Sequence, residues 1–410
     1  MQGRWFIDDV ARVVVLALMI VAAGITVWAQ SSSPPVDEAV SSTSRTAHNS
    51  DFSWLKTSRE GLEWMRDRGF SGQLSLVNDW SHNVDGGAIS PVSFERYSLD
   101  VGIKLDAQKA FHWAGATGFV RLKHHNGDVG GDYVGDAQGF SNIDGVPRTH
   151  LYELWGQQSL FNERLGVKFG KIDANSEFAV VHSAGDFLNG AMGYSPTILA
   201  FPTYPEPQPG INLFVRPKHY QVGVGVFRTN KAGSMSLLEG GREWVIGEKE
   251  LGGRVSFGFW RLGGPVERFD GDKDSGILGF YSVFEQTVWS RDRSSSAGQQ
   301  RLSAFLQYGH ANGELNCFRR HVGVGGVLES PFAVRPHDAL GLALTSVGLS
   351  DEPEAGFQLH GAETTLELYY KLNIRPFLSI VPDLQYIHNA GGIRSQGNAV
   401  VVTPRLVISF

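Results

Sequence analysis

The chain has 410 residues, a formal net charge of −6 and 19% charged residues, and glycine is abundant at 50 residues. The acidic balance excludes a general nucleic-acid-binding protein. The single cysteine, Cys317, excludes an intrachain disulfide and a cysteine-cluster metal site. The length allows two or three ordinary domains or one large β-barrel. Low charge and high glycine favour strands and turns over helices.

The first residues predict an export signal. Arg4 and Arg12 supply positive charge, an apolar run follows over 13–25, and small residues at 27–29 fit a cleavage site after Ala29. Residues 1–29 are therefore predicted to be a signal peptide. An uncleaved membrane anchor is the alternative, because the run is long for a signal. No later run is long enough for a transmembrane helix, so the exported chain is either soluble or crosses a membrane as strands.

Two short segments precede the region of alternating residues. Residues 30–50 are polar and aperiodic, which predicts a disordered linker. Residues 51–71 predict a short helical periplasmic segment, with its helix at 57–68. Thr57 and Glu60 there fit a capping box, and Gly69 fits a helix stop.

From Gly72 onward the chain alternates apolar and polar residues with a period of two. In "YSLDVGIKL", for example, Leu99 and Val101 fall on one face and Asp100 and Gly102 on the other. About sixteen strands are predicted, at roughly 72–80, 95–105, 114–124, 149–160, 165–172, 210–216, 219–227, 241–249, 252–260, 277–288, 301–309, 321–328, 339–347, 363–373, 377–387 and 400–410.

The connections between these strands distinguish a barrel from a soluble sandwich, which shows the same alternation. Long gaps alternate with short ones, and two gaps of intermediate length, 289–300 and 329–338, are exceptions. This alternation is typical of an outer-membrane barrel and predicts an all-β, transmembrane antiparallel β-barrel over 72–410. The long gaps include 125–148, 173–209, 261–276 and 388–399, and the short ones include 161–164, 217–218, 250–251 and 374–376.

The chain ends on the alternating strand "VTPRLVISF", 402–410. A free edge on such a strand would invite aggregation. Closure of the barrel would remove the edge by pairing 400–410 with the first strand near 72–80. Leu406, Ile408 and Phe410 are then expected to face lipid, with Phe410 in the aromatic girdle.

The region from about 70 to 410 resembles the carbohydrate-selective porin family, often called the OprB family. The resemblance rests on "GDAQGFSNIDG" (135–145), "LYELWGQQSLFNERLGVKFGKIDANSEFA" (151–179), "FLNGAMGYSP" (187–196) and "RPFLSIVPDLQYIHNAGG" (375–392). It implies a sixteen-stranded barrel through which sugars diffuse across the outer membrane. The terminal Phe410 resembles the signal read by the barrel-assembly machinery. Before the first strand, "FSWLKTSREGLEWM" departs from the Asp-Trp-Gly-Gly element common in the family.

The polar face of a barrel of this size lines a water-filled channel. Charged side chains there can exchange hydrogen bonds with sugar hydroxyls, although each alone can equally be a solvated wall residue. The candidate lining residues are Asp100, Lys104, Arg121, Lys123, Glu153, Lys168, Arg254, Glu367, Lys371 and Arg405.

The long connection 173–209 mixes carboxylates with aromatic residues. Asp173, Glu177 and Asp186 are its candidate channel residues, and Phe187 and Tyr204 are among its aromatic residues. One interpretation is a loop that folds inward and narrows the channel. The other is an extracellular flap whose aromatic residues pack against the wall.

Other patterns predict no cofactor or metal. In "DGDKDSG" (270–276) the aspartates have calcium-loop spacing, but Ser275 replaces the glycine and Tyr281 the glutamate of an EF-hand. Weak calcium binding remains the alternative there. The favoured function is passive diffusion of mono- or disaccharides. A general ion porin and a barrel-borne enzyme with a Ser–His pair on adjacent strands are the rivals.

Overall fold

The computed structural model describes residues 61, 63–229, 233–292, 299–358 and 361–410. The predicted signal peptide, the linker and the Thr57–Glu60 capping box lie outside the described residues. Within the described part, no helix is long and apolar enough to cross a membrane.

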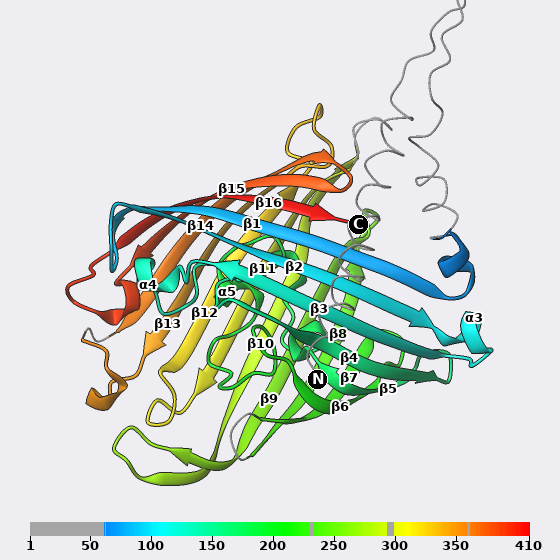
Figure 1. Cartoon of the computed structure of the whole chain (residues 1–410), viewed down its shortest axis with the longest axis horizontal. Helices are drawn as coiled ribbons and strands as arrows, with labels where there is room; N and C mark the ends of the chain where they lie inside the picture. Colours follow the sequence, from blue (N-terminus) through cyan, green and yellow to red (C-terminus); the bar gives the residue numbers. More distant parts are fainter. Residues whose placement is uncertain (1–60, 62, 230–232, 293–298, 359–360) are drawn as a thin grey trace, which may run out of the picture.

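Sixteen antiparallel strands form one closed barrel, as predicted (Figure 1). Each strand pairs with its sequence neighbours. The strands are β1 (Phe70–Gly86), β2 (Val92–Asp106), β3 (Ala116–Gly127), β4 (Arg148–Leu160), β5 (Leu165–Ile172), β6 (Gln208–Val215), β7 (Tyr220–Arg228), β8 (Ser234–Ile246), β9 (Leu251–Glu267), β10 (Lys273–Asp292), β11 (Gln299–Ala311), β12 (Phe318–Glu329), β13 (Ala339–Leu349), β14 (Ala362–Arg375), β15 (Leu378–His388) and β16 (Ala399–Ser409).

The last strand closes the barrel on the first. The β1–β16 register runs from Ser75 opposite Ser409 to Gly86 opposite Ala399. Phe410 continues it, since its N–H donates to the Leu74 carbonyl at 2.9 Å. The Phe410 ring stacks on Phe377 with centroids 5.1 Å apart. The terminal strand therefore has a partner, and the predicted pairing of 400–410 with the first strand is confirmed.

The longest connections lie at one end of the barrel, and the shortest turns lie at the other. The long-loop end carries 128–147, 173–207, 350–361 and 389–398, and the short-turn end carries 161–164, 216–219, 247–250 and 376–377. The predicted long loop 261–276 is wrong. β9 and β10 extend through most of it and pair from Lys273 and Glu267 onward, so only 268–272 remains a connection.

Small helices occupy some connections. They are α3 (Ala107–Phe111) at the short-turn end, and α4 (Gly131–Val134), η1 (Ala174–Ser176), η2 (His182–Ala184), α5 (Gly190–Gly193), η3 (Pro353–Ala355) and η4 (Ala390–Gly392) at the long-loop end. The described part of the predicted N-terminal helix is helical at 63–67. It stops where expected, because Gly69 takes a left-handed φ of 84°.

The two faces of the strands differ as the alternation predicts. On β14, Leu366 and Leu368 are 44% and 41% exposed on the outside, whereas Glu367 between them is fully buried inside. On β5, Phe169 points outward at 60% exposure and its neighbour Lys168 is buried. An apolar exterior and a polar interior are the arrangement of a barrel that spans a bilayer.

Candidate channel constriction

The β5–β6 connection, 173–207, folds into the barrel and follows the inner wall. Its residues make an ion pair with β5 and then hydrogen bonds in turn with β8, β10, β14 and β11. It therefore runs along the wall from β5 to β14. It also reaches the strands on either side, since Asp173 accepts from Tyr152 of β4 at 2.7 Å and Asn189 donates to Gln385 of β15 at 3.4 Å. This arrangement matches the inward-folding interpretation, and an extracellular flap does not fit it.

Wall carboxylates hold this inward-folded loop by its backbone. The Ala179 N–H donates to Glu239 at 2.8 Å, the Ser183 N–H to Glu285 at 2.6 Å and the Leu188 N–H to Glu367 at 2.5 Å. Loop backbone away from water needs such partners. The predicted residue Glu367 thus anchors the loop. Glu239 and Glu285 do the same, and they were not among the sequence candidates.

Aromatic contacts fix the same loop against the wall. The rings of Phe178 and Phe214 lie 5.1 Å apart, and Phe187 meets the Tyr369 ring edge-on at 4.8 Å. These side chains belong to two apolar clusters inside the lumen. Their burial stabilises the inward position of the loop beyond its hydrogen bonds.

A second connection, 128–147, also enters the lumen. The N–H groups of Ala137 and Gln138 donate to Glu363 at 2.8 and 3.1 Å. Asn142 joins the two loops, since its N–H donates to the Leu188 carbonyl at 2.7 Å. The sequence identified 125–148 as a long loop but gave no sign that it folds inward.

The remaining opening lies between these two loops and the wall formed by β14–β16 and β1–β4. It encloses a cavity of about 360 Å³, within the range of small-molecule sites. Its lining includes predicted residues from both the wall and the loop. The lining residues are Val77, Ser98, Asp100, Lys123, Asn142, Ile143, Tyr152, Gly185, Asp186, Tyr204, Lys371, Val381, Arg405 and Val407.

The charges at this opening come in pairs. The Lys123 Nζ lies 2.7 Å from the Asp100 carboxylate, and the Lys371 Nζ lies 2.6 Å from that of Asp186. Arg405 makes two hydrogen bonds to the buried Asp79, at 2.6 and 2.9 Å. The rim therefore offers donors and acceptors side by side with little net charge.

A β-bulge brings Tyr152 to the same opening. Arg121 pairs with Glu153 but Leu122 pairs with Leu151, so Tyr152 is the extra residue. Tyr152 and Glu153 are consequently both buried, 2% and 3% exposed, although strict alternation would place one of them outside. The ring lies 4.8 Å from the Lys123 ammonium. A one-residue bulge leaves no clear signal in the sequence, which is why Tyr152 was missed.

The other predicted residues lie on the lumen wall or on the inward-folded loop, away from the opening. Arg121 pairs with Glu153 at 3.2 Å, and Arg254 with Glu285 at 2.8 Å. Lys104 is exposed near the short-turn end of β2. The remaining pairs involve the loop: Lys168 pairs with Glu177, and Asp173 caps η1 and accepts from Tyr152 at 2.7 Å.

The calcium-like segment and a Ser–His pair on adjacent strands can both be located in the described structure. Arg268 pairs with Asp270 and Asp274 of the calcium-like segment. No group of three or more His, Cys, Asp or Glu in the described residues could hold a metal. His82 and Ser93 form a Ser–His pair at 2.8 Å on the outer face of β1 and β2. No further described side chain hydrogen-bonds the His82 ring, so the pair lacks the orienting group of a triad.

Comparison with known proteins identifies the family. The model of the carbohydrate-selective porin, OprB family, matches residues 96–410. The chain belongs to this family. Porin B of Pseudomonas aeruginosa is 23% identical over 407 residues, covering 84% of this chain and 88% of that protein. By membership, the chain is a sugar-selective porin of the outer membrane.

Two solved structures of Pseudomonas putida OprB share the fold of this porin. The high-pH structure superposes with a TM-score of 0.77 at 21% identity, covering 87% of this chain and 97% of that one. The low-pH structure gives a TM-score of 0.58 at 21% identity, covering 90% and 100%. This likeness shows that the barrel described here shares its fold with the two OprB structures.

Proposed function

We propose that mono- and disaccharides cross this porin by passive diffusion through the opening between the inward-folded loops and the β14–β4 wall, without a chemical step. Water fills the lumen of a barrel of this size. The two loops occupy part of its cross-section, so the opening between them and the wall sets which solutes pass. Selectivity then follows from the width and the lining chemistry of one constriction.

The observation that carries this proposal is the mixed lining of the opening. The Asp100–Lys123 and Asp186–Lys371 pairs present acceptors and donors that match sugar hydroxyls, which can both accept and donate. Tyr152 and Tyr204 also line the cavity, and Val77, Val381 and Val407 add apolar surface. A sugar ring has polar edges and apolar C–H faces, so it suits such a lining better than a simple ion does.

Liposome swelling with glucose, maltose and amino acids of matched size tests the proposal. Wild-type protein is expected to pass the sugars faster than the amino acids. Lys123→Met and Lys371→Met should reduce that preference severalfold, because each leaves a carboxylate without its partner. Ser93→Ala, on the outer face, is the matched control and should behave like wild type. Equal sugar and amino-acid rates in the wild type would instead indicate a general solute porin.

We also propose that the chain is exported with a cleaved signal peptide and is inserted by the barrel-assembly machinery. Cleavage after Ala29 would release the chain for the outer membrane, and the barrel-assembly machinery would then read the terminal strand. Phe410→Ala removes the ring that stacks on Phe377 and contributes only a few kcal/mol to the finished barrel. We expect much less protein in outer-membrane fractions, yet near-normal stability of what is assembled. Wild-type amounts of Phe410→Ala would contradict recognition of this residue.

A further inference from the structure

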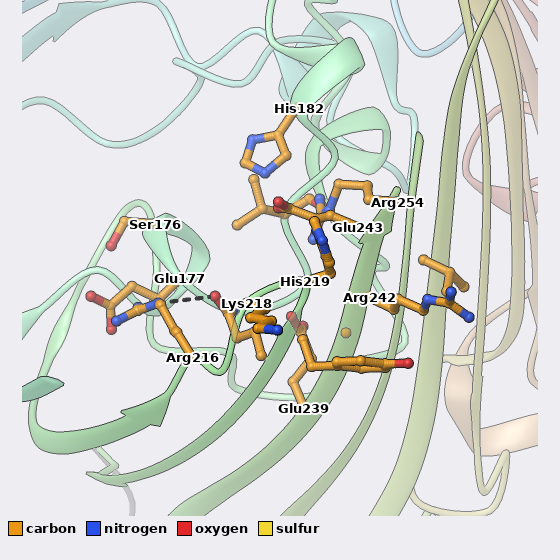
Figure 2. Close-up of a pocket in the computed structure, with 15 residues that line it drawn as sticks. Ser176, Glu177, His182, Arg216, Lys218, His219, Glu239, Arg242, Glu243 and Arg254 are labelled. Carbon is orange, nitrogen blue, oxygen red and sulfur yellow. Dashed lines mark hydrogen bonds between the residues drawn. The ribbon is translucent and has the colours of Figure 1, made fainter. Parts of the chain in front are cut away.

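A second cavity lies on the other side of the inward-folded loop, toward the short-turn end. It occupies about 310 Å³ between loop residues 176–182, the β6–β7 turn and the wall formed by β7, β8 and β9. Figure 2 shows Ser176 and His182 of the loop around the same space as Lys218 and His219 of the β6–β7 turn. None of its lining residues belongs to the constriction lining, so it is a separate chamber, here called the turn-side cleft.

Apart from Arg242, two cations of the turn-side cleft have no acidic partner among the described residues. Arg216 donates through Nε to Gln221 at 3.1 Å and lies over the Phe214 ring at 4.6 Å. These contacts hold the side chain and leave its two terminal amino groups available. Lys218, two residues on, is exposed and makes no hydrogen bond to the described part of the chain. A fixed guanidinium beside a free ammonium favours a carboxylate.

Most acidic groups in the cleft are already engaged. Glu177 is paired with Lys168, and Glu239 accepts from Ala179 and Tyr281, each at 2.8 Å. Glu243 is the exception, since it is exposed and forms no ion pair within the described residues. Its free oxygens are suited to accept from hydroxyl groups. The cleft thus joins two unpaired cations with one free acceptor.

The neutral imidazole of His182 adds a further polar contact. Partial burial, together with the nearby Arg254, lowers the pKa of His182 below its ordinary value. Its ring can therefore both donate and accept hydrogen bonds near neutral pH. Arg242 takes no part, because it lies over the outward-facing Tyr220 ring at 5.5 Å.

We propose that the turn-side cleft is a binding station for sugar acids, separate from the constriction. The carboxylate of a uronic or aldonic acid binds Arg216 and Lys218, while its hydroxyls contact Glu243 and His182. At the constriction each of the lining charges has an oppositely charged partner. The constriction therefore has little net charge with which to favour an acidic sugar over a neutral one. In the cleft, unpaired positive charge distinguishes an acidic sugar from its neutral analogue.

Titration calorimetry on the detergent-solubilised full-length porin tests this, with glucuronate and glucose as paired ligands at low salt. The wild type should bind glucuronate more tightly than glucose, and added salt should weaken only glucuronate binding. Arg216→Gln with Lys218→Gln is expected to weaken glucuronate binding about tenfold, the loss of roughly one charge-assisted hydrogen bond. Glucose binding should not change.

Two comparisons make the test decisive. Lys109→Gln, on α3 at the same end of the barrel, is the matched control and should keep wild-type glucuronate affinity. Lys123→Met, at the constriction, should also keep it. Unchanged glucuronate binding in the double variant would overturn the proposal, as would its loss in Lys123→Met. Heat-modifiable migration on gels verifies folding in each case. Glucose swelling rates test the constriction independently of these results.

Discussion

At the residue scale, buried charges inside this barrel work mainly by holding other parts of the chain. Asp79 is fully buried and accepts two hydrogen bonds from Arg405 and one from Ser141 of the 128–147 loop. Arg96 lies 3.6 Å from the same carboxylate. Burying ions is costly unless the geometry satisfies them. One such cluster therefore links β1, β2, β16 and an inward-folded loop.

Arg405→Met is expected to destabilise the barrel by roughly 3 kcal/mol or more, because it leaves the buried Asp79 carboxylate poorly paired. Adding Asp79→Asn should recover part of the loss, since the unpaired carboxylate is then removed and the buried Arg96 keeps Asp144 as a partner at 3.7 Å. Urea unfolding of protein folded into lipid vesicles gives both values. Additive losses in the double variant would show that the two side chains do not act as a pair.

Asp136, in the 128–147 loop, provides a pH test. Burial raises its pKa well above 3.8, and the nearby Glu363 and Asp144 raise it further. The folded protein therefore keeps a proton that the unfolded chain loses. The raised pKa of Asp136 therefore stabilises the folded protein fully below pH 3.8. This stabilisation is lost as the pH rises through the pKa that Asp136 has in the folded state.

Asp136→Asn should remove this dependence. The variant is expected to be more stable than wild type at pH 7 and equally stable near pH 3, because the two proteins then carry the same charge at this position. Thermal unfolding across this range, monitored by circular dichroism, measures the difference. A constant offset between the two proteins at every pH would contradict a titrating Asp136.

At the element scale, the 173–207 loop shows what sequence reasoning could and could not reach. Its length and its mixture of carboxylates and aromatic residues left two interpretations open, an inward-folded constriction and an extracellular flap. The alternation on the strands placed Glu367 and Lys371 inside correctly. Glu239 was missed because the predicted strand began at 241, whereas β8 begins at Ser234. Glu285 was missed because a wall carboxylate that binds a distant backbone N–H has no local pattern. Tyr152 was missed because the β4 bulge interrupts the alternation that the prediction assumed.

Removing loop anchors should widen the channel. Glu285→Ala with Glu367→Ala leaves the loop N–H groups of Ser183 and Leu188 without acceptors, at about 1–3 kcal/mol each. Single-channel conductance should rise and discrimination between small and large sugars should weaken, and deletion of 180–205 should do both more strongly. Glu95→Ala, which removes an outer-face carboxylate bonded to Asn78, is the control. Wild-type conductance in a folded double variant would show that these anchors do not hold the constriction.

At the scale of the whole molecule, the strand number and the two faces of each strand followed from period-two alternation, whereas the closed barrel followed from the lengths of the connections. The ends of the strands were predicted less accurately. Hairpins can continue beyond the bilayer, where no change in the sequence pattern marks the end of a strand. β9 and β10 are the example, since they pair through residues that had been assigned to a long loop. Inward folding of 128–147 depends on contacts with β14 and β15, far away in sequence.

The assignment of faces makes the broadest prediction. Leu368 lies midway along β14 and is 41% exposed on the outside. Leu368→Arg should cost roughly 2–4 kcal/mol, because it places a charge on the lipid face near the bilayer midplane. Thr117→Arg points the same side chain into the lumen, opposite Gln157, where water solvates it. Heat-modifiable migration should show poor assembly of Leu368→Arg and near-normal assembly of Thr117→Arg. Equal assembly of the two would mean that Leu368 does not face lipid, and the bilayer-spanning orientation of the whole barrel would then be wrong.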